Sequence, residues 1–376
     1  MPDPFFRDAL RLLRLLVSTP RVSRDEGRAA GILYDCMAAW GLRPQRVKNN
    51  VYALPLVTDA AKPTLLLNAH IDTVKAAATW TRAPHSPDIE CGRLYGLGSN
   101  DCGGGLVSLL TVYRMITVGK AAECDYNLVF LASAEEEVSG AGGISAVLPL
   151  LPRIDAAIVG EPTLMQPAVA EKGLMVIDGY CHGVSGHAAR DEGVNAIYEA
   201  LDDLAWLRDY RFQRVSPLLG PAKMTVTQVE SGTQHNVVPD SLHFVIDVRP
   251  NELYRNEDIL CFLQSHIRRC ELKARSLRLR SSSIDTGHPL VQRCLAMGLR
   301  PFGSPTLSDQ ALMPFPSLKM GPGDSARSHT ADEYIGIDEI ESAIDIYMKL
   351  LTSSCGDVEV GRCGGGEGNI QKLEFQ

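Results

Sequence analysis

The sequence predicts an α/β fold with a second domain inserted into the first. Short runs of apolar residues at 65–67, 126–132 and 156–159 are typical of buried strands, because a strand covered on both faces needs no polar side. From about residue 173 the pattern changes to strand, helix, strand, strand, helix, strand, the order of a ferredoxin-like domain. The chain then returns to its earlier α/β character, which indicates an insertion into a loop.

Hydrophobic spacing gives each domain its expected elements. In the inserted domain we expect strands at 174–183, 223–230, 242–248 and 271–280, and helices at 193–209 and 256–268. In the first domain we expect a hairpin over 43–57 about Asn49-Asn50, a helix near 288–298, a strand at 317–320 and a helix at 337–351. Ser23-Arg24-Asp25-Glu26 predicts a capping box at the start of an early helix.

Composition excludes several functional classes. The 376-residue chain is 45% hydrophobic and 22% charged, which is ordinary for a globular protein. Its net charge of −8 offers no basic footprint for nucleic acid, and no run approaches the roughly 20 apolar residues of a membrane span. The ten cysteines lack a C-x-x-C motif, so we expect free thiols and a cytoplasmic protein.

Ionisable side chains follow each of the three apolar runs. These residues, with one from the glycine-rich loop between the runs, are His70, Asp72, Asp101, 135–137 and Glu161. Asp101 could simply cap the following helix, and three adjacent glutamates could lie on a solvated loop. Their recurrence at strand ends favours one shared site, because parallel strands bring their carboxyl ends together. A bound dication would relieve the repulsion between adjacent carboxylates.

Seven blocks of the chain stand in an order that resembles a known family. They are NAHIDTV, GLGSNDCGGG, SAEEEVSG, IVGEPT, GVSGHAAR, GTQHNVVPDSLHFVIDVRP and GPGDSARSHTADE. With them the chain resembles the M20 metallopeptidases and deacylases over nearly its whole length. One block departs from the family pattern: Asp101 is followed by Cys102 and Gly103 where the family has methionine and lysine. The aspartate is kept and the lysine is lost.

The resemblance implies a zinc-exopeptidase-like catalytic domain with a mixed sheet and an inserted dimerisation or lid domain. We expect the catalytic domain at 1–172 and 285–354, the ferredoxin-like insertion at 173–284 and a flexible tail at 355–376. Two divalent ions, zinc or cobalt, would be held by His70 with Glu161 and by Glu137 with His329; Asp101 would bridge them, and Asp72 would orient His70. Such a mixed set of nitrogen and oxygen donors suits these ions.

The resemblance also assigns residues around the metals. Glu136 aligns with the general base, and His187 with a histidine that reaches into the active site of the partner subunit of a homodimer. Asn236 and Arg249 match positions that contact substrate, although an arginine after a strand can equally form a structural ion pair. Arg327 is a candidate cation for the carboxylate of a succinyl group.

The activity implied is hydrolysis of an N-acyl amino acid, a small molecule. The blocks look most similar to acetylornithine deacetylase-like enzymes of arginine biosynthesis, although a succinyl-diaminopimelate desuccinylase or an M20 dipeptidase or aminopeptidase is a rival. A rival of another class is a binding protein that kept the scaffold and lost the metals. We expect no nucleic acid and no membrane as partners.

Overall fold

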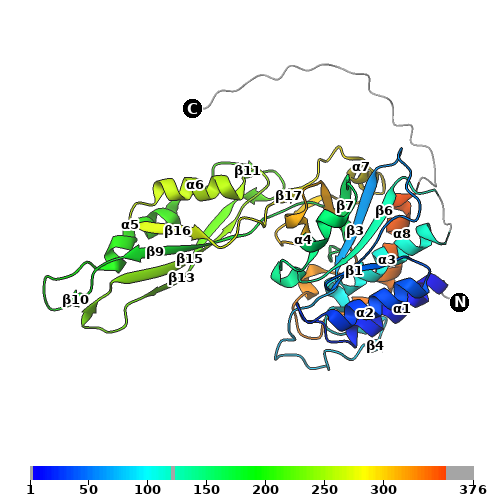
Figure 1. The fold of residues 1–376 in the computed structure, drawn as a ribbon, viewed down its shortest axis with the longest axis horizontal. Helices are drawn as coiled ribbons and strands as arrows, with labels where there is room; N and C mark the ends of the chain where they lie inside the picture. The colour runs from blue at the N-terminus through cyan, green and yellow to red at the C-terminus, as the bar shows by residue number, and fades with distance from the viewer. Residues whose placement is uncertain (1–2, 120–122, 353–376) are drawn as a thin grey trace, which may run out of the picture.

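The computed structural model describes residues 3–119 and 123–352. It consists of two units, a larger one built on a nine-stranded sheet and an elongated one built on a four-stranded sheet (Figure 1). The predicted tail at 355–376 lies outside the described residues. Within the described ranges, no helix combines the length and the apolar character that crossing a membrane requires.

The large sheet is mixed, as predicted. Its strands, in spatial order, are β1 (Gln45–Val47), β2 (Asn50–Ala53), β6 (Asn127–Ser133), β3 (Thr64–His70), β7 (Ala156–Val159), β19 (Ser317–Lys319), β8 (Ala168–Glu171) and β17 (Ser282–Ser283), and β18 (Phe302–Ser304) also pairs with β8. Strand β3 runs parallel to both β6 and β7, so the carboxyl ends of all three meet at one edge. The three apolar runs of the sequence are these central strands.

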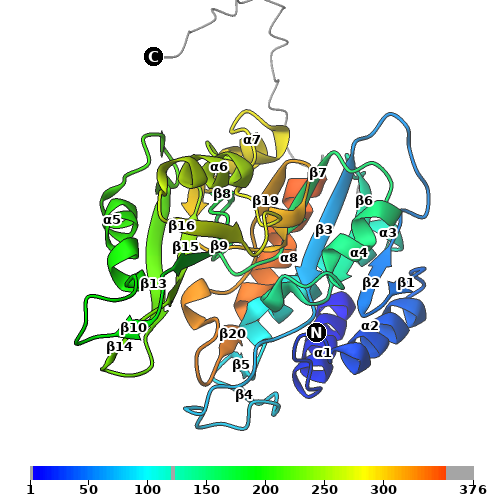
Figure 2. The same cartoon turned by 60° about the vertical axis from the view of Figure 1, so that its left-hand side comes forward.

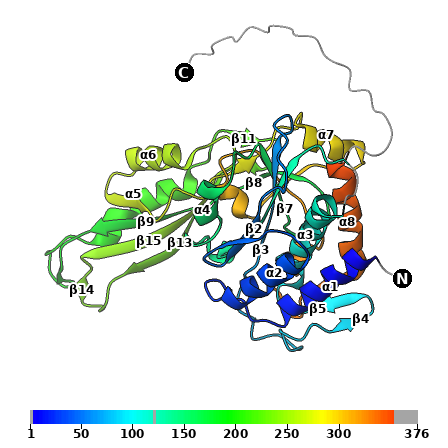
Figure 3. The same ribbon diagram turned by 45° about the vertical axis from the view of Figure 1, so that its right-hand side comes forward.

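Both faces of the large sheet are buried. Leu65 and Leu67 pack with the helices of one face, while Leu66 joins a smaller cluster on the other, because side chains alternate along a strand. Figure 3 shows α1, α2, α3 and α8 together on the face that Leu65 and Leu67 cover. The helices of this unit are α1 (Pro4–Val17), α2 (Gly27–Ala39), α3 (Gly104–Thr117), α4 (Ile144–Val147), α7 (Pro289–Ala296) and α8 (Ile337–Leu351).

The predicted capping box before α2 is wrong. The residue at the cap is Glu26, and no side chain makes a capping hydrogen bond there. The Ser23 hydroxyl donates instead to the Asp72 carboxylate at 2.6 Å, and Glu26 accepts a hydrogen bond from the backbone of Glu135. Both candidate capping side chains are therefore used by partners that lie far away in the sequence.

The four-stranded unit has the predicted element order. It runs β9 (Met175–His182), α5 (Ala196–Asp209), β13 (Lys223–Ser231), β15 (Ser241–Arg249), α6 (Asn256–His266) and β16 (Cys270–Ala274). Its strands lie in the order β13-β15-β9-β16, and each neighbouring pair is antiparallel. Both helices pack on this sheet over a hydrophobic cluster of its own. Strand β17 already pairs with β8 of the large sheet, just before the predicted return at 285.

Short elements complete the described chain. The strand pairs and small sheets are β10 (Gly186–His187) with β14 (Val237–Val238), β11 (Val215–Ser216) with β12 (Gly220–Pro221), and β4 (Ile89–Glu90) with β5 (Arg93–Tyr95) and β20 (Tyr334–Gly336). Figure 2 shows β10 and β14 at the end of the four-stranded unit that lies away from the large sheet.

Replacing Gly105 by alanine tests the close packing of α3 on the large sheet. A Cβ at this position would lie 1.7 Å from the carbonyl oxygen of Gly160, which follows β7. We expect Gly105→Ala to lower the free energy of unfolding in urea by about 3 kcal/mol or more. The matched control is Gly31→Ala in α2, where the nearest atom to a Cβ is 3.7 Å away and alanine should add roughly 0.5–1 kcal/mol. Equal effects of the two changes would contradict this packing.

Candidate active site

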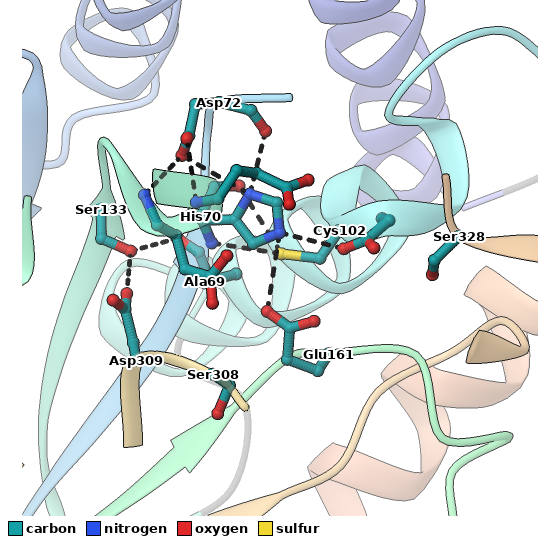
Figure 4. A network of polar contacts seen from close by, with 12 residues as sticks. Ala69, His70, Asp72, Cys102, Ser133, Glu161, Ser308, Asp309 and Ser328 are labelled. Atoms are coloured by element: carbon teal, nitrogen blue, oxygen red, sulfur yellow. Dashed lines mark hydrogen bonds and ion pairs between the residues drawn. The ribbon is translucent and has the colours of Figure 1, made fainter. Parts of the chain in front are cut away.

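The ionisable residues predicted at strand ends lie at one edge of the large sheet. His70 ends β3, Glu136 and Glu137 lie in a short 3-10 turn directly after β6, and Glu161 lies two residues beyond β7. Asp101 belongs to the irregular turn before α3. Figure 4 shows His70 and Glu161 facing one another near the turn that carries Cys102. The parallel alignment of three neighbouring strands therefore creates the cluster.

Asp101 lies between two histidines that come from opposite parts of the chain. His70 Nε2 is 3.0 Å from Asp101 Oδ1 and 3.6 Å from Glu161 Oε1. His329 Nε2 is 3.5 Å from Asp101 Oδ2 and 2.9 Å from Glu137 Oε2. Each oxygen of Asp101 thus faces a different histidine, and each histidine has a second carboxylate beside it. Such an arrangement of donors could hold two adjacent cations with one carboxylate shared between them.

Burial and mutual repulsion shift the acids of this cluster. Burial, followed by the charge of Asp101, raises the pKa of Glu161 to about 8. Burial likewise raises the pKa of Glu136 well above its ordinary value. The hydrogen bond to Glu137 raises the pKa of His329 to about 9. Concentrated carboxylates of this kind require positive charge beside them, and divalent cations would supply it.

Comparison with known proteins identifies the family of this chain. Residues 66–353 match the family model described as peptidase family M20/M25/M40. The chain belongs to peptidase family M20/M25/M40. Curated relatives include the acetylornithine deacetylases of Proteus mirabilis (26% identical over 92% of this chain and 96% of the relative) and Edwardsiella ictaluri (28%, 92% and 97%).

Solved structures share the fold of this chain. Aminopeptidase PepT from Bacillus cereus is similar with a TM-score of 0.76 and 16% identity, over 92% of this chain and 98% of that one. The YXEP protein of Bacillus subtilis, described as a dinuclear metal binding peptidase from the M20 family, has a TM-score of 0.69 and 16% identity, over 92% and 97%. At these identities the likeness concerns the fold.

In this M20 chain the Asp72 carboxylate orients the turn of the two glutamates more directly than it orients His70. The Nδ1 atom of His70 lies 2.9 Å from the backbone oxygen of Asp72, while the nearer carboxylate oxygen is 3.7 Å away. That carboxylate accepts hydrogen bonds from the backbone N–H groups of Glu136 at 3.1 Å and Glu137 at 3.2 Å, besides the one from Ser23. The main-chain carbonyl therefore fixes the imidazole, and the side chain fixes the turn.

The adjacent acids of the SAEEEVSG block have different surroundings. Glu135 has a left-handed backbone, with φ of 53°, and its N–H donates to Glu26 at 3.0 Å. Its carboxylate accepts the N–H of Gly142 at 3.1 Å, which closes the loop that follows β6. Glu137 faces His329, whereas Glu136 lines the same cavity without an ion pair to either histidine among the described residues. A solvated charge run would not show this division.

The cavity above the cluster has a volume of ≈ 410 Å³. Besides the acids and His329, its walls come from residues 162–164, 302, 304–307, 324–325 and 328. Lys319 also lines it, with its ammonium 3.0 Å from Glu171 Oε2 and 3.0 Å from the carbonyl oxygen of Thr306. Leu164, Phe302 and Leu307 make part of the wall apolar, so the cavity suits a small molecule with polar and apolar parts.

The predicted residues His187, Asn236 and Arg249 do not line this cavity. His187 lies in β10, where its Nδ1 accepts the N–H of Ala189, and the carbonyl of Asn236 lies beside it, bonded to the N–H of Ala188. Arg249 pairs with Asp247 at 2.8 and 3.0 Å, which is the structural ion pair left open by the sequence.

The structure does not support Arg327 as a cation for a substrate carboxylate. Its two guanidinium arms bond to the carboxylate of Glu339 at 2.7 and 3.0 Å. The guanidinium also lies over the ring of Tyr334, 4.6 Å from the ring centre. A fork that is already filled by an internal carboxylate has no free pair of donors for a succinyl group.

Sequence reasoning missed several buried groups beside the cluster. Glu333 accepts the backbone N–H groups of Gly98, Asn100 and Asp101 at 2.8–3.0 Å. Asp309, whose pKa burial raises to about 6, accepts the hydroxyl of Ser133 at 2.5 Å. Glu333 lies within the quoted GPGDSARSHTADE block, but nothing in a single sequence separates a buried carboxylate from an exposed one.

The stability of metal-free protein should fall as pH rises from about 6 to 8.5. Burial raises the pKa of Glu161 to about 8 and that of Glu333 to about 7, so the folded state holds protons that the unfolded state has released. Their stabilising effect is complete below about pH 4.5 and is lost as pH rises through the folded values. The stabilising effect of protonated His329 is complete below about pH 6.5 and is lost as pH rises through about 9, so it also makes stability fall with rising pH.

The measurement is the Tm of chelator-treated protein at about pH 6 and about pH 8.5. We expect a Tm lower by a few degrees at pH 8.5. Added zinc should reduce or reverse the difference, because ligands must be deprotonated to bind metal. A metal-free protein that is equally stable or more stable at pH 8.5 would show that these acids are not held protonated.

Proposed function

We propose that this chain is a dinuclear metal amidohydrolase that removes an acyl group, acetyl in preference to succinyl, from the α-nitrogen of an amino acid. The observation that carries the proposal is the placement of Asp101 between His70 and His329, each with its own second carboxylate. Membership of the M20 family supports hydrolysis of an amide. The relatives named acetylornithine deacetylase, which align over 92% of the chain, support the deacylase type.

The residues present fit a pair of zinc or cobalt ions. His70 and Glu161 would hold one ion and His329 and Glu137 the other, with Asp101 between them. These are imidazole and carboxylate donors, which suit such ions. Cys102 Sγ also lies within 4.8 Å of ligand atoms of His70 and Glu161, and it accepts the backbone N–H of His70 at 3.1 Å. Two dications polarise an amide carbonyl and lower the pKa of water.

Glu136 is the proposed general base. It lines the cavity and lies next to a proposed ligand in the turn that Asp72 fixes. A carboxylate in this position accepts the proton of the attacking water and passes it to the departing amine. The hydrogen bond from the backbone N–H of Glu136 to Asp72 holds the backbone of Glu136, so the Glu136 carboxylate stays directed at the cavity. Amine and carboxylic acid then leave as separate products.

A substrate panel with metal-supplemented enzyme tests the substrate class. The panel compares N-acetyl and N-succinyl ornithine, N-acetylcitrulline, N-succinyl-diaminopimelate and a set of dipeptides, each with zinc or cobalt. We expect the highest kcat/KM for N-acetylornithine, which would place the enzyme in arginine biosynthesis. Preference for dipeptides would instead support a dipeptidase or aminopeptidase. No turnover and no bound metal would support a binding protein on the same scaffold.

Glu136→Gln separates the roles of the two glutamates. Because glutamine keeps the size of the side chain but cannot take a proton, we expect kcat to fall about 10²–10⁴-fold while two metal ions per chain remain bound. Measuring kcat together with metal content by elemental analysis makes the comparison. The control is Glu341→Gln, which removes an exposed carboxylate on α8 and should leave both quantities unchanged. Normal turnover by Glu136→Gln would refute the assignment.

We also propose that the enzyme is a homodimer in which His187 serves the partner's site. In the subunit itself His187 is exposed on β10 and does not line the cavity. Large apolar side chains are exposed on the same unit: Tyr198 is 71% exposed, Leu201 51% and Val229 53%. An exposed apolar surface of this kind fits a contact with a second copy. An imidazole from that copy would donate to the developing oxyanion.

Mixing two inactive variants tests this arrangement. Glu136→Gln subunits lack the base, and His187→Ala subunits lack the donated imidazole. If His187 acts in the partner's site, one site of each mixed dimer has both groups, so activity should recover to about a quarter of the wild-type value. The assay is turnover after the two variants are mixed and allowed to exchange subunits. Failure to recover, with exchange verified by mass spectrometry, would show that His187 does not act in trans.

A further inference from the structure

An arginine is completely buried beside the proposed metal site. Arg21 is 1% exposed and has the largest volume of the fully buried side chains among the described residues. Its Nη1 donates to the carbonyl oxygen of Ile71, and its Nη2 donates to the carbonyl oxygen of Gly98 at 2.7 Å. Its Nε has no hydrogen-bond partner among the described residues. A guanidinium so costly to bury is held by two main-chain carbonyls.

These two carbonyls belong to the segments that carry proposed metal ligands. Ile71 directly follows His70, and Gly98 precedes Asp101 by three residues. The planar fork of an arginine fixes the distance between two acceptors, unlike the point charge of a lysine. Arg21 therefore ties the end of β3 to the turn before α3, and with it His70 to Asp101.

Glu333 holds the same loop from the other side. It is 2% exposed, and its carboxylate accepts the N–H groups of Gly98, Asn100 and Asp101. Gly98 is thus fixed through its N–H by Glu333 and through its carbonyl by Arg21. Its φ of 74° favours glycine, and a Cβ there would lie 2.4 Å from Arg21 Nη2.

We propose that Arg21 and Glu333 are positioning residues that clamp the loop of residues 98–101 and so fix Asp101 opposite His70 for metal binding. This inference rests on the proposed dinuclear site. A positive charge near two dications weakens their binding through repulsion, whereas a rigid loop strengthens it by holding the ligand in place. Removing Arg21 would therefore strengthen metal binding through lost repulsion and weaken it through lost rigidity. The clamp requires that the loss of rigidity is the larger effect.

Zinc titrations of the metal-free full-length chain test the clamp. Arg21→Met, Arg21→Lys and Glu333→Gln are compared with the wild type by competition against a chromophoric chelator. We expect Arg21→Met to lower zinc affinity about 10–100-fold. Arg21→Lys keeps the charge and loses the fork, so it should also weaken zinc binding. Glu333→Gln keeps fewer acceptors for the three N–H groups, so we expect the same direction. Arg21→Met with unchanged or tighter zinc binding would overturn the clamp.

Arg46→Met is the matched control. Arg46 donates to the carbonyl oxygens of Lys48 and Gly27 and to the side-chain oxygen of Asn49, away from the cluster. Arg46→Met should lower the stability of the metal-free protein without changing its zinc affinity. If Arg21 had a purely structural role, Arg21→Met would show the same result. Circular dichroism and thermal unfolding confirm that each variant is folded.

The titration separates failure of the clamp from failure of the proposed site. If the wild type binds no zinc, the dinuclear site itself is refuted. If the wild type binds zinc and all folded variants bind it equally well, only the clamp is refuted. Loss of folding in all three variants, with Arg46→Met folded, also overturns the clamp, because Arg21 and Glu333 would then serve the fold and not the site.

Discussion

Electrostatic repulsion between buried carboxylates is the constraint on which the rest of this structure depends. The parallel alignment of β3, β6 and β7 forces the acids that follow these strands into one place. Burial, together with the neighbouring carboxylate charges, raises the pKa values of Glu136 and Glu161. Two imidazoles from segments 259 residues apart, His70 and His329, reduce the repulsion in part. A pair of divalent cations is the chemical solution that the donor set fits.

The surrounding groups keep these acids apart at fixed positions. Asp72 holds the turn with Glu136 and Glu137 through two backbone N–H groups, and Glu333 holds the turn with Asp101 through three. Both turns are therefore fixed through their main chains, which leaves the carboxylates of the proposed ligands free to face the cavity. The proposed base Glu136 and the proposed ligand Glu137, which are adjacent in sequence, can then have separate roles.

The strand ends and the order of the elements could be predicted because their signals are local. Apolar runs reveal β3, β6 and β7, and hydrophobic spacing reveals the order of the four-stranded unit. The interactions that could not be predicted join distant residues. Ser23 suggests a helix cap until Asp72, 49 residues away, is seen to accept its hydroxyl. Arg21 looks like an ordinary surface residue, and its burial follows only from contacts with segments distant in the sequence, at Ile71 and Gly98. The filled fork of Arg327 has the same origin.

The residues that line the cavity all belong to the larger unit, and the exposed apolar side chains of the four-stranded unit fit the proposed contact with a second copy. The central claim is that residues distant in the sequence converge on two cations in the larger unit. Anomalous diffraction from crystals grown with zinc, recorded on both sides of the zinc absorption edge, tests it most directly. The account predicts two peaks about 3.5–4 Å apart, flanking Asp101, one beside His70 and Glu161 and the other beside His329 and Glu137. A single peak, or peaks away from these residues, would contradict it.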